Sequence, residues 1–283
     1  MLSKRVETHI TDGNRESLLS TVFDVNWLKV ETTDRVRRLT IDRPNRKNAV
    51  PADGWLSLAA VFDDFEKSDD RVLVVTGAGG NFCAGADLDA DHLSEATSAS
   101  AAHRRMKLVE RAAIALHRTT KPTIAAVDGV AVGAGMNLAL GCDVVIATDR
   151  ARFSEIFVRR GLTVDFGGTW LLPRIVGLQR AKELALSGRI IEAEEAERMG
   201  IAMEIVPVER LYGRCNEVAR SFLAGAPLGQ MFAKQMLDAS FESSFSESVS
   251  WEGQSQSIVL GTEDATEGVS AFLEKRDPIW GGR

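Results

Sequence analysis

The chain has 283 residues, of which 45% are hydrophobic and 26% are charged, and its formal net charge is -6. This composition is that of a globular protein with a sizeable core, and it excludes a disordered or low-complexity chain. The Lys and Arg residues are scattered, which excludes the basic surface of a general nucleic-acid binder. Because no uncharged apolar run reaches about 18 residues, the sequence predicts no membrane span.

The three cysteines, Cys83, Cys142 and Cys215, lie far apart and form no C-x-x-C motif. This pattern argues against a disulfide scaffold and favours a reducing compartment. Residues 1–20 lack the continuous apolar segment of a secretory signal and contain acidic residues that transit peptides avoid. The four histidines show no zinc-ligand spacing. We therefore expect a cytoplasmic protein without a bound metal.

Taken in chain order, the sequence begins with a polar segment, residues 1–25, that we expect to be a flexible extension before the packed domain. Alternating apolar residues over 28–41 predict a hairpin. A polar loop follows, and Pro51 marks the start of an amphipathic helix. The apolar run 72–75 predicts a strand that is buried on both faces.

The next part of the chain alternates strands and helices. The pattern predicts a long helix over 99–119, stopped by Pro122. Strands are expected at 123–127 and 143–147, with a helix from Gly133–Gly135 to Leu140 between them. After Pro173 the spacing is helical to about residue 275. A strand-rich first two-thirds with a helical last third predicts an α/β fold.

Several common sequence motifs fail when they are tested. The dinucleotide fingerprint G-x-G-x-x-G needs a third glycine. Phe82 stands at that position in the segment that begins at Gly77, and Leu138 stands there in the segment that begins at Gly133. The sequence has no phosphate-loop motif and no G-x-S-x-G nucleophile motif. These results make phosphate-loop and serine-hydrolase chemistry poor interpretations.

Two glycine-containing segments, residues 82–88 and 128–136, each directly follow a predicted buried strand. Their small side chains would let a ligand approach backbone N–H groups, and a helix that begins at Gly135 adds its positive dipole end. Two convergent N–H groups form an oxyanion hole. The alternative is close packing of strand on helix, for which glycine merely makes room.

Five ordered segments are similar to a known family, and they are residues 41–49, 82–88, 126–136, 161–174 and 272–276. From about Trp27 to its end, the chain resembles the crotonase, or enoyl-CoA hydratase/isomerase, superfamily. The resemblance implies an α/β, crotonase-like spiral of ββα units with a helical C-terminal oligomerisation region. It divides the chain into residues 1–25, a core over 26–220 with the acyl-CoA site, and a trimerisation region over 221–283. Such proteins form trimers or dimers of trimers.

The resemblance also implies a site for an acyl-CoA thioester, with coenzyme A entering as part of the substrate and no separate cofactor. The backbone N–H groups of Ala86 and Ala134 would form the oxyanion hole, and Asp165 stands where isomerases of this superfamily have a catalytic carboxylate. Lys275 is expected to reach a phosphate in a neighbouring subunit. The CoA- and acyl-binding positions are Arg46, Lys47, Ala49, Ala84, Asp87, Leu88, Gly133, Phe157 and Lys275.

The sequence departs from true hydratases of this superfamily at both catalytic glutamates. The aligned positions hold Asn137, which is no base near neutral pH, and Phe157, which has no proton to exchange. Glu155 is an alternative, but on one strand it would lie about 6.6 Å from position 157, too far for a direct replacement. For Asp165 the alternative role is a helix N-cap, since Gly-Gly-Thr follows it.

We therefore interpret the protein as an enoyl-CoA isomerase with Asp165 as its proton shuttle. The alternatives are an enoyl-CoA hydratase that places water with Asn137 or Glu155, a hydrolytic enzyme with Asp165 as nucleophile, and a catalytically silent acyl-CoA-binding protein. The acyl group stays open, because its pocket depends on the variable stretch 89–107.

Overall fold

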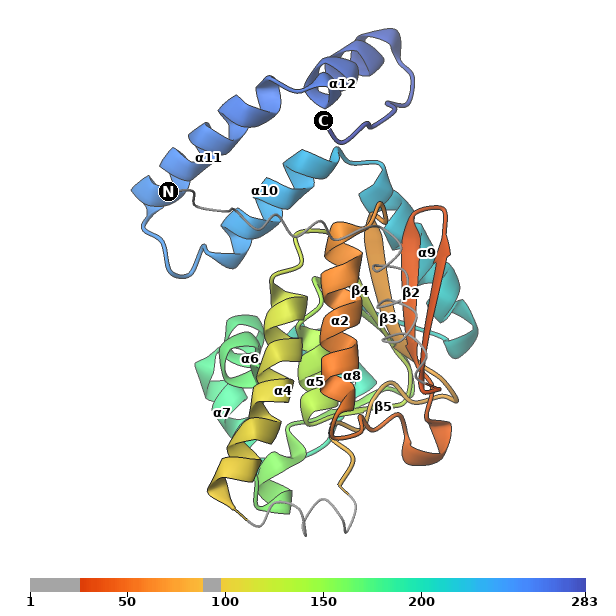
Figure 1. Cartoon of the computed structure of the whole chain (residues 1–283), viewed down its shortest axis with the longest axis vertical. Coiled ribbons are helices and arrows are strands. Elements are labelled where there is room, and N and C mark those ends of the chain that lie inside the picture. The colour runs from red at the N-terminus through yellow and green to blue at the C-terminus, as the bar shows by residue number, and fades with distance from the viewer. Residues whose placement is uncertain (1–25, 89–97) are drawn as a thin grey trace, which may run out of the picture.

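The computed structural model describes residues 26–88 and 98–283. The predicted extension, residues 1–25, lies outside the described residues. So do residues 89–97 of the stretch 89–107 that was expected to shape the acyl pocket. The described chain is an α/β structure with a six-stranded sheet, a three-stranded sheet and helices on both faces of the larger sheet (Figure 1). The predicted α/β architecture is thus confirmed.

The larger sheet has the strand order β1-β2-β3-β4-β6-β9. The predicted hairpin is confirmed, because β1 pairs antiparallel with β2, and the later neighbours pair in parallel. Every residue of β3 and β4 is buried, which explains their continuous apolar runs. The strands are β1 (Leu28–Thr33), β2 (Val36–Ile41), β3 (Val72–Gly77), β4 (Thr123–Val127), β6 (Val144–Thr148) and β9 (Glu204–Val206).

The smaller sheet consists of β5 (Val130–Val132), β7 (Arg152–Ser154) and β8 (Ile191–Glu192). β5 pairs in parallel with β7, and β7 pairs antiparallel with β8. β5 and β8 were not predicted, because two or three residues are too few to show an alternating pattern, and the strand assumed at 155–157 lies just beyond β7. This sheet matters for the site, because β5 leads into α5 (Ala134–Leu140) and β7 leads to Glu155.

Two helix layers cover the larger sheet. On one face α2 (Gly54–Lys67), α4 (Ala99–His117) and the fully buried α5 pack with the sheet into the main hydrophobic core. On the other face α9 (Leu211–Leu223) packs on β3, β4 and β6 and forms a second core. The boundary expected between residues 220 and 221 falls inside α9.

The remaining described helices complete the chain. They are η1 (Pro44–Arg46), η2 (Ile156–Arg160), α6 (Gly168–Val176), α7 (Leu178–Ser187), α8 (Ala193–Met199), η3 (Val208–Arg210), α10 (Pro227–Asp238), α11 (Phe245–Leu260) and α12 (Glu263–Glu274). The change to helical spacing expected after Pro173 comes earlier, because Pro173 lies inside α6. The helical last third is also interrupted by β8 and β9.

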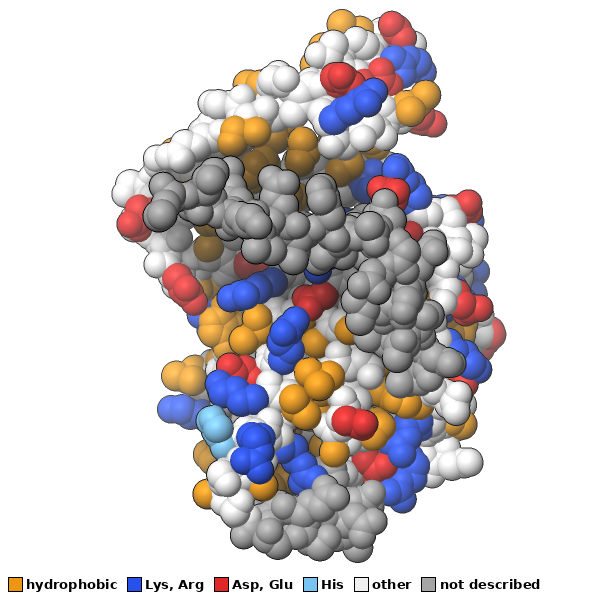
Figure 2. Space-filling model, viewed as in Figure 1, with side chains coloured by type: hydrophobic (Ala, Val, Ile, Leu, Met, Phe, Trp, Pro, Cys, Tyr) orange, Lys and Arg blue, Asp and Glu red, His pale blue; other side chains and the backbone are white. Residues whose placement is uncertain are grey.

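The C-terminal helices α10–α12 extend away from the sheets (Figure 1) and bury few of their own residues. Phe245 and Phe272 are 85% and 82% exposed. On the face drawn in Figure 2, hydrophobic side chains of these helices reach the surface. The apolar faces of this region therefore have no cover within the described part of the chain.

Candidate active site

The two glycine-containing turns predicted from the sequence lie against each other. Gly85 has a φ of +84°, and a Cβ atom there would lie 3.0 Å from the Val132 oxygen and 3.3 Å from the Ala134 nitrogen. Gly133, the N-cap of α5, has a φ of +57° and a ψ of -132°, which side-chain-bearing residues rarely adopt. Glycine is thus required in both turns for different reasons: close approach at Gly85 and backbone conformation at Gly133.

The backbone N–H groups predicted to form the oxyanion hole are Ala86 and Ala134. Ala86 forms a parallel β-bridge with Val50. The hydrogen bonds of this bridge involve the neighbours of Ala86: the Val50 N–H donates to the Gly85 oxygen at 2.8 Å, and the Asp87 N–H donates to the Val50 oxygen at 2.9 Å. The Ala86 N–H therefore points away from Val50. Ala134 is the first residue of α5, where an N–H has no partner within its own helix. Within the described residues neither N–H donates to an acceptor.

Close packing of strand on helix also occurs in this region. A Cβ atom at Gly135 would lie 2.1 Å from the Cys83 oxygen, so only glycine lets α5 approach the turn this closely. The alternative interpretation of the glycines thus applies to Gly135. It does not account for the N–H groups of Ala86 and Ala134, which have no acceptor among the described residues.

Asp165 lies in the turn before α6, and its side chain is half-buried. Burial raises the pKa of its carboxyl from 3.8 to about 6. Its Oδ1 has no hydrogen-bond partner among the described residues. The helix-capping alternative is wrong, because the N-cap of α6 is Gly167 and no side chain caps it. Asp165 is thus a partly dry carboxyl with no structural partner for its Oδ1.

Asn137 and Glu155 lie next to the Asp165 turn. The Asn137 side-chain nitrogen Nδ2 donates to the Asp165 carbonyl oxygen at 2.9 Å and to Glu155 Oε2 at 3.3 Å. Both side chains are completely buried. Burial, reinforced by the Asp165 charge, raises the pKa of the Glu155 carboxyl from 4.5 to about 7, and the Asn137 hydrogen bond opposes that rise. Two residues whose carboxyls have raised pKa values therefore contact one amide, Glu155 through its carboxyl and Asp165 through its backbone oxygen.

The strand spacing that set Glu155 aside is wrong for the local backbone. Glu155 and Phe157 were expected on one extended strand, but β7 ends at Ser154. Glu155 is the N-cap of η2, with a φ of -79° and a ψ of 60°, and Phe157 lies inside that helix. The spacing of a strand does not apply across this bend, and sequence periodicity gave no sign of it.

Phe157 lies where the resemblance predicted part of the acyl-binding site. It is buried, and a Cβ atom at Gly133 would lie 3.6 Å from its ring. An apolar ring thus stands beside the glycine that precedes the Ala134 donor. The position supplies an apolar surface and no proton.

The predicted CoA-binding loops also lie side by side. The Ala84 N–H donates to the Lys47 oxygen at 3.0 Å, and the Ala49 N–H donates to the Arg46 oxygen at 3.0 Å. Arg46 pairs with Asp87 at 2.8 Å. Lys47 is exposed, as is Leu88, which borders the residues outside the description. The loop at 46–49 and the turn at 84–88 therefore form one surface.

Two residues that hold this surface together were missed by the sequence reasoning. Arg43 pairs with Asp87 at 2.9 Å. Asn48, completely buried, donates from Nδ2 to the Ala78 oxygen at 2.8 Å and to the Asn81 oxygen at 2.6 Å. Both residues lie in the segment 41–49, from which the sequence reasoning took only Arg46, Lys47 and Ala49.

Lys275 is not brought to the other predicted residues within the chain. It is exposed at the C-cap of α12, whereas β5, which leads to Ala134, lies at the opposite end of the molecule (Figure 1). A role for Lys275 at the site therefore requires a second copy of the chain.

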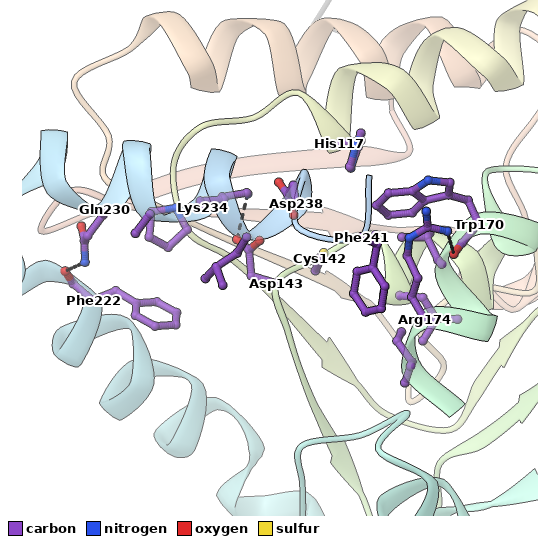
Figure 3. A pocket seen from close by; sticks show the side chains of 17 residues that line it. His117, Cys142, Asp143, Trp170, Arg174, Phe222, Gln230, Lys234, Asp238 and Phe241 are labelled. Atoms are coloured by element: carbon purple, nitrogen blue, oxygen red, sulfur yellow. Dashed lines mark hydrogen bonds and ion pairs between the residues drawn. The ribbon is translucent and has the colours of Figure 1, made fainter. Parts of the chain in front are cut away.

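A cavity of about 500 Å³ lies between α6, α10 and the end of α5 (Figure 3). Its Lys234 pairs with Asp143 at 2.9 Å, and the Arg174 guanidinium lies 3.8 Å from the centre of the Trp170 ring. None of the predicted site residues lines it. Its charged groups serve contacts between α10 and the core, so we do not assign it to the active site.

Two further properties concern the described residues alone. No group of three or more His, Cys, Asp or Glu side chains in 26–88 and 98–283 is placed to hold a metal ion. Within the same ranges, none of the helices combines the length and the apolar character that crossing a membrane requires.

A backbone N–H without an acceptor at the start of α5, with a half-buried carboxyl in a turn that is hydrogen-bonded to the same helix, fits the class of enzymes that stabilise an oxyanion during acyl chemistry. The model of the enoyl-CoA hydratase/isomerase family matches residues 31–283. The chain belongs to this family, and the resemblance to the crotonase superfamily is confirmed. It is an enzyme of the enoyl-CoA hydratase/isomerase superfamily.

The chain is 38% identical over 254 residues to the 1,2-epoxyphenylacetyl-CoA isomerase of Escherichia coli (strain K12), covering 88% of this chain and 95% of that protein. It is 36% identical over 256 residues to a probable enoyl-CoA hydratase of Rhodobacter capsulatus, covering 90% and 98%. The enoyl-CoA hydratase structure from Bacillus anthracis matches with a TM-score of 0.86 at 29% identity, covering 91% and 100%. The crotonase-like fold is therefore confirmed.

Proposed function

We propose that the protein is an enoyl-CoA isomerase that moves a carbon–carbon double bond from position 3 to position 2 of an acyl-CoA. The observation that carries the proposal is the half-buried Asp165 carboxyl, which has a pKa of about 6 and an Oδ1 without a partner among the described residues. A carboxyl of this kind exchanges protons readily near neutral pH. The two positions where hydratases hold glutamates are Asn137 and Phe157, which supply no such group.

In the proposed reaction the Asp165 carboxylate takes a proton from C2 of a 3-enoyl thioester. The negative charge moves to the thioester oxygen, where the Ala86 and Ala134 N–H groups bind it. Each such donor contributes about 2.7 to 4 kcal/mol of transition-state stabilisation. The carboxylic acid of Asp165 then returns the proton at C4 and leaves the 2-enoyl thioester. One carboxyl suffices, and coenzyme A takes part only as a portion of the substrate.

The names of the relatives include both an isomerase and hydratases. The Escherichia coli relative is named as an isomerase of a CoA ester, which supports the proposal. Other relatives are named as hydratases. Glu155 favours a hydratase as the second candidate function, because it adds a second buried carboxyl near Asp165, and hydration uses an acid and a base.

The experiment compares a 3-enoyl-CoA with the matching trans-2-enoyl-CoA while the absorbance of the conjugated enoyl group is followed. We expect the 3-enoyl substrate to be converted by the parent protein and not by Asp165→Ala. Hydration of crotonyl-CoA that survives Asp165→Ala would replace the isomerase by the hydratase. Tight binding of CoA esters without turnover of any enoyl-CoA would indicate a catalytically silent acyl-CoA-binding protein.

We also propose that the chain forms a homotrimer or a dimer of trimers through α10–α12. The exposed apolar side chains of this region support the proposal, since a covered surface would remove them from water. In such an assembly Lys275 is free to reach a CoA phosphate in a neighbouring subunit. Sedimentation equilibrium tests it: a mass of one 30.8 kDa chain at micromolar concentration would contradict it.

A further inference from the structure

The turn that carries Asp165 is held from outside by a hydrogen bond from Asn137 and by packing of the Trp55 ring on Phe166, whose ring centres lie 5.5 Å apart. The Asp165 carbonyl oxygen accepts hydrogen bonds from the Gly168 N–H at 3.0 Å and from Asn137 Nδ2 at 2.9 Å. The first bond closes the turn, and the second ties it to α5. Phe166, inside the turn, has a φ of +50°, a left-handed conformation that is costly for a bulky residue. A turn of this kind keeps its shape only where its surroundings hold it.

Asn137 is in turn held by Glu155. The Asn137 amide nitrogen has two hydrogens, so it can donate to the Asp165 carbonyl and to Glu155 Oε2 at the same time. A Cβ atom at Gly168 would lie 2.3 Å from the same nitrogen, so the amide packs directly on the backbone of the turn. The chain of contacts therefore runs from Glu155 through Asn137 to Asp165.

We propose that Glu155 is a positioning residue, which fixes the Asn137 amide and thereby the place of the Asp165 carboxyl. The inference rests on the proposed function, in which Asp165 moves the substrate proton. For this role Glu155 must offer an acceptor oxygen to Asn137, and it needs no negative charge. A neutral amide at position 155 would serve equally well.

The exposure of the two carboxyls supports this division of roles. Glu155 has no exposed surface, whereas Asp165 is partly exposed. A group that transfers a proton to a ligand entering from solvent must be open to that ligand. Burial also raises the pKa of Glu155 to about 7, so much of the protein carries it uncharged at neutral pH. The full burial of Glu155 thus suits a positioning residue, and the partial exposure of Asp165 suits the group that reacts with the substrate.

The test compares Glu155→Leu, which removes the acceptor, with Glu155→Gln, which keeps one. In the full-length protein we expect Glu155→Leu to lower kcat about 10- to 100-fold with KM changed less than about threefold, because displacement of a reacting group by about 1 Å costs up to about 100-fold. Glu155→Gln should retain kcat within about threefold. Asn137→Ala should match Glu155→Leu, and combining the two should add no further loss.

Glu66 provides a matched control, because its carboxylate accepts hydrogen bonds from the Thr120 N–H at 2.9 Å and from Thr120 Oγ1 at 2.6 Å, away from Asp165. Glu66→Leu should lower the melting temperature and leave kcat unchanged. A second measurement needs no activity: amide hydrogen exchange of residues 163–171 should accelerate in Glu155→Leu and not in Glu155→Gln or Glu66→Leu.

Each outcome bears on the inference. A kcat for Glu155→Leu equal to that of the parent, or an additive loss with Asn137→Ala, would overturn it. If Glu155→Gln is as inactive as Glu155→Leu, the acidic proton of Glu155 is needed and a direct role replaces positioning. Activity that survives in Asp165→Ala would contradict the proposed function instead, and hydrogen exchange would still decide whether Glu155 holds the turn.

Discussion

Replacing Glu155 by Gln should make the folded protein more stable at alkaline pH and change how its stability depends on pH. Burial raises the pKa of this carboxyl from 4.5 to about 7, so ionising it costs more in the folded than in the unfolded chain. The Asn137 hydrogen bond that stabilises the ionised form is too weak to cancel the burial. A glutamine keeps an acceptor for Asn137 and has no charge to desolvate.

The sign of the effect follows from proton binding. Below pH 4.5 both states hold the proton, so Glu155 causes no loss of stability. Between pH 4.5 and about 7 the unfolded chain releases the proton first, and the free energy of unfolding falls as the pH rises. The pKa difference corresponds to about 3 kcal/mol at 1.36 kcal/mol per pH unit. Relative to the parent, Glu155→Gln should therefore gain about 3 kcal/mol between pH 4.5 and pH 8.

Urea unfolding at pH 5 and pH 8, at one fixed subunit concentration, measures this difference. Glu66→Gln is the control, since Glu66 is half-buried and accepts two hydrogen bonds from Thr120. Equal pH dependence of the parent and Glu155→Gln would show that Glu155 is solvated or paired in solution. The reasoning from burial would then be refuted, whatever the catalytic results.

Two further predictions concern activity. In the isomerase assay kcat/KM should fall about tenfold from pH 8 to pH 5, since Asp165 acts as the ionised base and its pKa is about 6; a flat profile over this range would contradict that role. Gly133→Ala should lower kcat about 10- to 100-fold. The backbone at Gly133, with a φ of +57° and a ψ of -132°, disfavours a side chain, so the substitution should displace the N–H of the next residue, Ala134. Gly213→Ala, in open space on α9, is its control, and an equal loss there would contradict the argument.

The parts of the fold that could be predicted are those with enough residues to show a period. β4 (Thr123–Val127) matches its expected bounds because it is a continuous apolar run, and α9 (Leu211–Leu223) lies in the part of the chain where helical spacing was expected. The strands of the smaller sheet have two or three residues, and partners distant in the sequence determine their pairing. Local pattern therefore contains little information about them.

In the candidate site, too, features set by local sequence could be predicted and features set by tertiary packing could not. The small residues at 82–88 and 128–136 predicted two tight turns at strand ends, and the structure brings these two turns into contact. Glu155 was underrated because its place depends on where β7 stops and on how α5 packs against the Asp165 turn. Both are tertiary effects. The available signal in the sequence was Glu155, a single charged residue between apolar neighbours, and the spacing of a strand did not describe its position.

The charges of the site give one reason for a single reacting carboxylate. In the proposed reaction the negative charge of Asp165 passes to the thioester oxygen at the Ala86 and Ala134 N–H groups as the proton moves to Asp165. The charge of the site then stays constant, and only its position changes. A second carboxylate, ionised at Glu155, would oppose the charge on Asp165 in a dry setting, and the Asp165 charge indeed raises the pKa of Glu155. A protonated Glu155 holds the Asn137 amide in place without adding that repulsion.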